Sequence, residues 1–257
     1  MSESIEVIRE KANQGDSNAQ YEMGNLYAKG EQVESDLSEA AVWYTKATEQ
    51  EHPDAMCNLA YLLYTGQGVD QDEGKAMEWF SKAAEAGQPQ AALNLGIHFT
   101  ESQVEANIEK ALHWLKVAAA NGEPEAAHNL GILYFEGSKV DADWDLAFQY
   151  FNQAADLDFM ESIYCVGFCY SKGYGVEKSE TEAVKFYKRC AEAGHVNGQY
   201  NLGLHYEYGV GGLETDPEEA LFWYQKASNQ GHERAAESIR LLEESMKQSS
   251  GETSENS

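Results

Sequence analysis

Apolar residues recur along this chain at a short helical spacing inside a long period of 35 or 36 residues. Each period opens on a small residue, with a large apolar residue four positions later and another four beyond that. The small residues are Ala19, Ala55, Ala91, Ala126, Ser162 and Gly198; the next row is Met23, Leu59, Leu95, Leu130, Val166 and Leu202; the last is Tyr27, Leu63, Phe99, Tyr134, Tyr170 and Tyr206. Positions i, i+4 and i+8 share one helix face, so the pattern predicts a helix at the start of every period.

A second helix is predicted in each period, because an alanine is followed three residues later by an aromatic residue. These pairs begin at Ala40, Ala76, Ala111, Ala147, Ala183 and Ala220, and their aromatic members are Trp43, Trp79, Trp114, Tyr150, Phe186 and Trp223. Asp36, Asp72, Asp143 and Asp216 stand near its start, where aspartate caps helices well. Glycine or alanine follows the large residue of each first helix. Glycine inside a helix is unfavourable, so we expect the second helix to cross closely there.

A fixed period of this length predicts an all-α solenoid of stacked helix pairs. We expect an N-terminal capping helix over residues 1–14 and six repeats over residues 15–231. A C-terminal capping helix is expected over residues 232–248, with Arg240 in place of the repeat's small residue, where it would block a further second helix. The last residues, 249–257, are polar and are expected to be disordered.

The repeated pattern A-x-x-N-L-G-x-x-Y, G-x-G-V and W-x-x-K-A-A resembles the Sel1-like repeat family, a relative of the tetratricopeptide repeats. The resemblance covers about residues 15–245 and implies a right-handed α/α superhelical solenoid and an adaptor protein. A secreted, cysteine-rich branch of the family is linked to β-lactam binding and hydrolysis. Cys190 matches the first cysteine position of that branch, but Gly198 stands where its disulfide partner would lie, so the chain departs from it.

Charge narrows the choice of partner. The chain has 44 acidic and 18 basic residues, a net charge of −26, which repels nucleic-acid phosphates and anionic membranes and favours cationic partners. The same charge would also keep a helical protein in solution, and both interpretations stay open. The first residues show no basic start or apolar run, so we expect a cytoplasmic protein with neither an export signal nor a membrane span.

Two rows of residues are candidates for a partner-binding groove, because first helices line the concave face of tetratricopeptide-like arrays. One row is amide-rich, and amides can bind the backbone of an extended peptide or bond neighbouring helices. The other row is largely apolar and forms an interaction patch unless curvature buries it. The predicted groove residues are Asn58, Asn94, Asn129 and Asn201 in the first row, and Tyr61, Ile97, Ile132, Phe168 and Leu204 in the second.

His128 is a further groove candidate from its helix position, although a lone histidine is more often a hydrogen-bonded bystander. No catalytic motif, metal motif or cofactor site is predicted from the other histidines or the carboxylates. Two G-x-G pairs lack the strand and third glycine of a nucleotide-binding loop. The four cysteines follow no zinc-like spacing and are expected to be small buried residues.

The sequence therefore predicts a protein–protein interaction adaptor that binds a protein or peptide, possibly basic, in its concave groove. One rival is a β-lactamase-like or peptidoglycan-related hydrolase, as in the cysteine-rich branch. Another is a structural subunit that uses its flanks for self-assembly. Intact turnover of a chromogenic β-lactam would favour the first rival, and a concentration-dependent mass in solution would favour the second.

Overall fold

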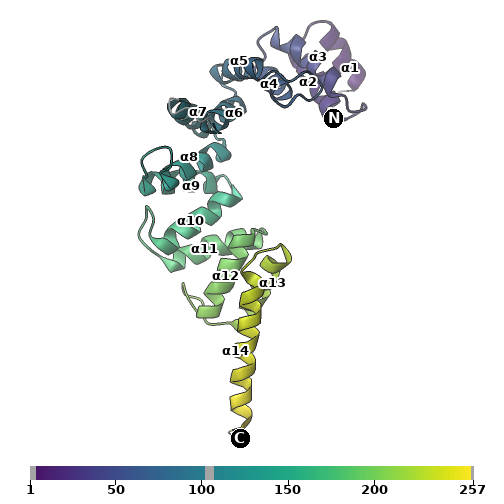
Figure 1. Ribbon diagram of the computed structural model, residues 1–257. Coiled ribbons are helices and arrows are strands. Elements are labelled where there is room, and N and C mark those ends of the chain that lie inside the picture. The colour runs from purple at the N-terminus through teal and green to yellow at the C-terminus, as the bar shows by residue number, and fades with distance from the viewer. Residues whose placement is uncertain (1–3, 102–106, 256–257) are drawn as a thin grey trace. The chain divides into compact units, whose positions relative to one another are not determined.

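The computed structural model describes residues 4–101 and 107–255, and within them the chain forms fourteen α-helices and no β-strand (Figure 1). The predicted all-α class is confirmed. The chain divides into two compact units, residues 1–126 and 127–257, and each is described by itself. The third repeat has no glycine between its two helices and is one residue shorter than the others, which predicts a tightened loop; that loop overlaps residues 102–106, which lie outside the described part of the chain.

Helices of the N-terminal unit pack on their neighbours in sequence. They are α1 (Ile5–Asn13), α2 (Ser17–Lys29), α3 (Leu37–Thr48), α4 (Pro53–Thr65), α5 (Glu73–Glu85), α6 (Pro89–Glu101) and α7 (Asn107–Ala120). The even-numbered helices are the first helices of the repeats. The cap α1 packs on α2 and buries Ile8 and Ala12, as the sequence predicts for a helix that covers the first repeat.

The C-terminal unit continues the alternation. Its helices are α8 (Pro124–Glu136), α9 (Trp144–Asp156), α10 (Met160–Lys172), α11 (Glu180–Glu192), α12 (Val196–Tyr208), α13 (Pro217–Asn229) and α14 (Ala235–Glu255). From α9 onward each helix packs on the next. The last helix, α14, runs past residue 248, where the sequence placed the start of a tail. Arg240 is exposed and paired along α14 with Glu237 and Glu244.

The core follows the predicted stripe. The row that begins at Met23 is buried throughout both units, whereas the row that begins at Tyr27 is only half-buried. The side chains of the Tyr27 row therefore lie at the boundary between the core and the solvent-exposed surface. Alanine and other small residues at the start of each first helix are also buried, so neighbouring helices interlock large side chains with small ones.

The glycine beside each stripe residue marks a close helix crossing. A Cβ built on Gly24 would lie 2.4 Å from the Tyr44 ring, and one on Gly203 would lie 2.6 Å from the Tyr224 ring. The predicted close approach is confirmed. The ring in the notch, however, belongs to the residue after the aromatic residue that the sequence singled out, so Tyr44 rather than Trp43 fills it. Trp43 is nevertheless buried, against α1 and α2.

Helix ends carry the predicted signals. The Asp36, Asp72, Asp143 and Asp216 side chains accept backbone N–H groups at the starts of second helices. Gly30, Gly66, Gly173 and Gly209 end first helices in the left-handed conformation.

The second glycine has a separate role in the two G-x-G loops noted in the sequence and in a third one, at residues 209–211. The backbone of Gly68 lies against Leu37, that of Gly175 against Trp144, and that of Gly211 against Glu180, so each loop rests on the second helix of the preceding repeat. A side chain at any of these three positions would collide with main-chain atoms. The G-x-G pairs are therefore inter-repeat contacts.

Candidate functional site: the groove of the C-terminal unit

A hollow of about 920 Å3 lies in the C-terminal unit, along α10, α12 and the turn before α14. Several aromatic side chains contribute to its lining. Tyr164 and Phe168 come from α10, and Tyr200 and Tyr208 from α12. Each helix contributes residues from successive turns, so the hollow extends along the first helices as a groove. Tyr208 is the most open of these residues, with 65% of its surface exposed. We call this hollow the C-terminal groove.

Hydrogen bonds link the aromatic wall across repeats. The Asn201 amide donates to the Tyr164 hydroxyl at 3.4 Å, and the Tyr200 hydroxyl lies 3.5 Å from Ser238 Oγ on α14. Burial raises the pKa of Tyr164. Both rings present apolar surface with a polar tip to a ligand.

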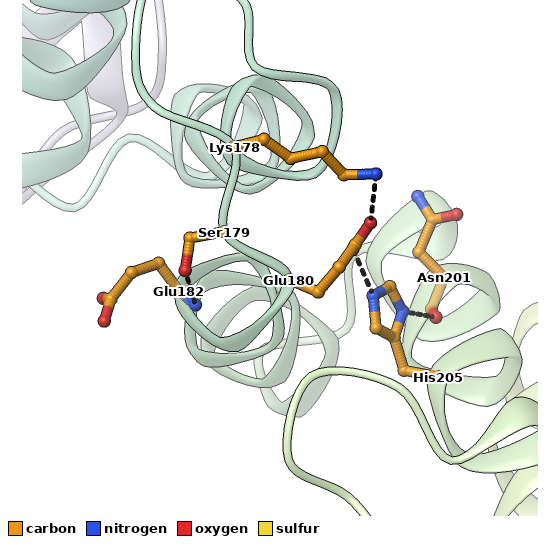
Figure 2. Close-up of polar contacts among 6 residues, drawn as sticks. All are labelled: Lys178, Ser179, Glu180, Glu182, Asn201 and His205. Atoms are coloured by element: carbon orange, nitrogen blue, oxygen red, sulfur yellow. Dashed lines mark hydrogen bonds and ion pairs between the residues drawn. The ribbon is translucent and has the colours of Figure 1, made fainter.

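One wall of the groove is an ordered polar cluster (Figure 2). His205 Nδ1 lies 2.7 Å from the Asn201 carbonyl oxygen, and its Nε2 lies 3.2 Å from Glu180 Oε2. Lys178 Nζ lies 3.2 Å from the other oxygen of Glu180. Ser179 caps the start of α11 by accepting the Glu182 N–H, which holds Glu180 at the first helical position.

The cluster neutralises the acid that faces the groove. Burial works toward a higher pKa for Glu180, but hydrogen bonds from Lys178 and His205 outweigh it and hold that pKa below its ordinary value. Lys172, at the end of α10, is also in the lining and has its Nζ 6.0 Å from the centre of the Phe168 ring. The groove thus offers aromatic faces and amides together with the charged side chains of Lys172, Glu233 and Arg234, a combination that can bind an extended peptide.

Three of the predicted residues, Phe168, Asn201 and Leu204, line this groove. Phe168 and Leu204 are half-buried, and they also contact rings or apolar residues of their own unit. The Asn201 amide donates one hydrogen bond to Tyr164 of the neighbouring first helix. For this residue, the structure thus agrees with the alternative that the asparagine row bonds neighbouring helices.

The predicted residues on α8 lie elsewhere in the C-terminal unit. His128 is half-buried and its Nδ1 lies 2.8 Å from Ser162 Oγ, beside the Phe159 ring, so its polar contact is internal. Ile132 packs against the core. Asn129 is half-buried and has no hydrogen bond within the described residues.

In the N-terminal unit, the residues of the two predicted rows differ in their contacts and exposure. Asn58 donates to Asn25 Oδ1 at 3.3 Å, an inter-repeat bond like that of Asn201. Tyr61 is 51% exposed, and Ile97 is half-buried. Asn94 is half-buried with no hydrogen bond among the described residues. Among these four predicted residues, Tyr61 is the exposed one.

The sequence missed several lining residues of the C-terminal groove. Tyr164 and Tyr200 occupy the same repeat position, two residues after Ser162 and Gly198, and that recurrence was a readable signal. His195 and His232 stack on these two rings with centroid distances of 4.8 and 4.2 Å. Each histidine stands three residues before the small residue that opens the next first helix.

The burial and pKa values of the four cysteines do not indicate a functional site. All four are free thiols, and Cys57, Cys169 and Cys190 are buried, with Cys165 half-buried. Burial raises the pKa of each thiol to about 12. Across residues 4–101 and 107–255, no group of histidine, cysteine and carboxylate side chains is arranged to hold a metal ion. In that same part of the chain, no helix is both long and apolar enough to cross a membrane.

A family model described as Sel1 repeat matches most of the sequence in six consecutive segments. These are residues 17–52, 53–88, 89–123, 124–159, 161–195 and 196–232. Each segment joins one first helix to one second helix of the structure, with boundaries close to those read from the periodicity. No curated protein matches the chain in sequence.

Solved structures share the fold. A protective antigen of uropathogenic Escherichia coli strains, described as displaying an SLR fold, is 30% identical with a TM-score of 0.86; the match covers 93% of this chain and 51% of that one. This chain thus spans about half of that protein. A Sel1 repeat protein from Oxalobacter formigenes is 28% identical with a TM-score of 0.76, over 88% of this chain and 100% of that one. An immunity protein from Pseudomonas aeruginosa, 23% identical with a TM-score of 0.50 over 88% and 81% of the two chains, shares the fold alone.

Proposed function

Because this chain belongs to the Sel1 repeat family, whose members generally serve as protein-interaction scaffolds, we propose that it binds an extended segment of a partner protein along its first helices. The observation that carries the proposal is the C-terminal groove. Tyr164, Phe168 and Tyr200 form an aromatic wall there, with Asn201 between them. Aromatic faces bind apolar side chains at little entropic cost, and amides bind a peptide backbone whatever its sequence.

The N-terminal unit adds a second binding surface of the same kind. Tyr61 is exposed, and Asn94 has an amide with no partner in the described residues. We propose that both units contact the partner through their first helices. Two modest contacts on one chain raise the overall affinity, because the second binding event is intramolecular once the first has formed.

We propose further that the partner segment is basic. The chain carries a net charge of −26, and a field of that sign speeds the approach of cationic segments. Glu180 is already paired with Lys178, and Glu233 of the lining is next to Arg234 in sequence, so the attraction would come from the whole surface. Attraction of this kind weakens as salt rises through about 0.15 M, where the screening length is about 8 Å.

The test is affinity capture from lysate, with matched variants of the bait. The groove variant combines Tyr61→Ser and Tyr208→Ser, and the control variant combines Val42→Ser and Phe222→Ser on second helices. The control residues are 48% and 50% exposed, comparable to Tyr61. A protein kept by the parent and the control but lost by the groove variant would support the proposal.

Equal retention by all three baits would place the binding surface away from the first helices. Salt then tests the charge: a captured partner whose affinity does not change between 0.05 and 0.5 M NaCl would show that the acidic surface serves solubility, on the screening lengths expected over that range.

A further inference from the structure

Two stacked ring pairs in the C-terminal groove join one repeat to the next. Tyr164 of α10 stacks on His195 with an interplanar angle of 25°, and Tyr200 of α12 stacks on His232 at 22°. In both pairs the tyrosine lines the groove and the histidine stands just before the following first helix. The position of each tyrosine in the wall therefore depends on the histidine beneath it.

His195 holds the start of α12 through an unprotonated nitrogen. Its Nδ1 accepts the Gly198 N–H at 3.1 Å and so caps the helix. Protonation would turn this acceptor into a donor that faces another donor, and the cap would be lost. It would also place a positive charge at the positive end of the helix dipole, which disfavours cations.

Protonation of the His232 ring is also unfavourable. Its Nδ1 is buried and has no hydrogen-bond partner in the described part of the chain. A proton there would create a buried N–H without an acceptor, which costs far more than an exposed one. The guanidinium of Arg234, two residues away, adds like-charge repulsion, and Glu233 opposes it.

Other neighbouring groups favour protonation of these two histidines. Glu161 of α10 attracts a charge on His195, and a protonated ring would gain a cation–π contact with its tyrosine. Burial outweighs these attractions, since it lowers the pKa of both His195 and His232 below the ordinary value. Burial raises the pKa of Tyr164, so its ring stays uncharged across this pH range.

His205 provides an internal contrast within the same groove. Acceptors face both of its ring nitrogens, the Asn201 carbonyl at Nδ1 and Glu180 at Nε2. A protonated His205 can donate to both, so acid leaves its contacts in place. In this groove, by contrast, His195 loses its hydrogen bond from Gly198 on protonation, and His232 gains a buried N–H without an acceptor.

We propose that the C-terminal groove is acid-sensitive: protonation of His195 and His232 releases the start of α12 and the turn before α14, so that the walls formed by Tyr164 and Tyr200 loosen. Between pH 7.5 and 5.5, histidine is the side chain whose ordinary pKa lies within the interval. As regulation of the binding groove, this inference rests on the proposed function; the loosening itself requires no partner and is measured without one.

The test uses NMR on the full chain without ligand. We expect the His195 and His232 rings to titrate below the ordinary histidine pKa of about 6.5. We also expect the Gly198 amide to lose protection against hydrogen exchange, corrected for intrinsic rates, between pH 7.5 and 5.5.

The chain itself supplies non-titrating replacements. Gln88 occupies the place of His195 in an earlier repeat and caps its helix by accepting the Ala91 N–H at 2.7 Å. Phe159 occupies the same place before α10 and keeps a ring there. The double variant His195→Gln, His232→Phe should therefore fold and keep its Gly198 protection at pH 5.5, whereas the control His113→Gln, at an exposed position on α7, should lose protection as the parent does.

Two results would overturn the inference. One is a parent whose Gly198 protection does not change with pH or falls equally in the double variant. The other, decisive even if the double variant fails to fold, is a titration of both parent rings at or above pH 6.5, the ordinary value. If a partner is captured but the groove does not respond to acid, the inference fails and the proposed function stands. If the groove responds to acid but no partner is captured, the inference stands and the proposed function fails.

Discussion

The sulfur of Cys190 fills the space that a side chain at Gly198 would need, since a Cβ built on Gly198 would lie 2.3 Å from Cys190 Sγ. Most other repeats hold alanine in both places, and the fifth repeat opens on serine instead. The equivalent pairs are Ala47 with Ala55, Ala83 with Ala91, Ala118 with Ala126, Ala154 with Ser162, and Ala227 with Ala235. A larger residue on the second helix is thus matched by a smaller one on the next first helix.

The matched pair predicts a substitution whose effect changes sign with its partner. Gly198→Ala in the parent should destabilise by about 1–3 kcal/mol, as overpacked cores do. In a Cys190→Ala background the space is open, and the same substitution should stabilise by roughly 1 kcal/mol through helix propensity. Urea unfolding of the four proteins measures the cycle; additive effects would show that the two residues are not coupled.

Gly175 should tolerate no side chain. It has φ +67°, and a Cβ there would overlap the Trp144 carbonyl group, which is main chain and has little freedom to yield. Gly175→Ala should therefore cost about 3 kcal/mol or more, combining left-handed strain of about 1–2 kcal/mol with the collision. Gly87→Ala is the matched control, because Gly87 has φ +90° and no atom near its Cβ position. Thermal unfolding that gave equal losses for the two would contradict the inter-repeat contact.

His128 should make stability depend on pH. Burial lowers its pKa, with Glu161 opposing, so below the ordinary value of about 6.5 the unfolded chain binds more protons than the folded one. Its stabilising contribution is complete above that pH and is lost as the pH falls. The melting temperature of the parent should therefore drop more between pH 7.5 and 5.5 than that of His128→Gln. A parallel drop in both would mean that His128 has the same pKa folded and unfolded.

The thiols should be unreactive in the native protein. Burial raises the pKa of Cys57, Cys165, Cys169 and Cys190 to about 12, and the thiolate is the reactive form. At pH 8 we expect negligible modification by a thiol-specific chromogenic disulfide over minutes, and four thiols modified after addition of denaturant. Rapid native labelling of Cys165, the half-buried member, would show that α10 opens locally.

Sequence periodicity was sufficient for the helices and their core. The Met23 row is buried because a helical stripe must face a partner, and six copies of the stripe leave little ambiguity about its face. Periodicity did not identify the ring in each notch. Tyr44 and Trp43 are adjacent in sequence, and the crossing of the two helices decides which one meets Gly24. That geometry is set by packing and is not encoded in spacing.

Periodicity also predicted part of the lining of the C-terminal groove. Phe168, Asn201 and Leu204 could be placed in the groove because their rows flank the core stripe. The pairing of Tyr164 with His195 joins two repeats, and its stacking depends on how one repeat is rotated against the next. The superhelical handedness and the order of the tail 249–257 stay predictions.

The loop contact of Gly175 on Trp144 also bears on how the protein can be cut and joined. Each such loop is packed against the helix that precedes its own first helix, as the Gly211 contact with Glu180 shows again. A fragment that starts at a first helix, such as α10, leaves this loop without its support. A fragment that starts one helix earlier keeps it, so recombination of Sel1 arrays should succeed with boundaries shifted by half a repeat from the sequence motif.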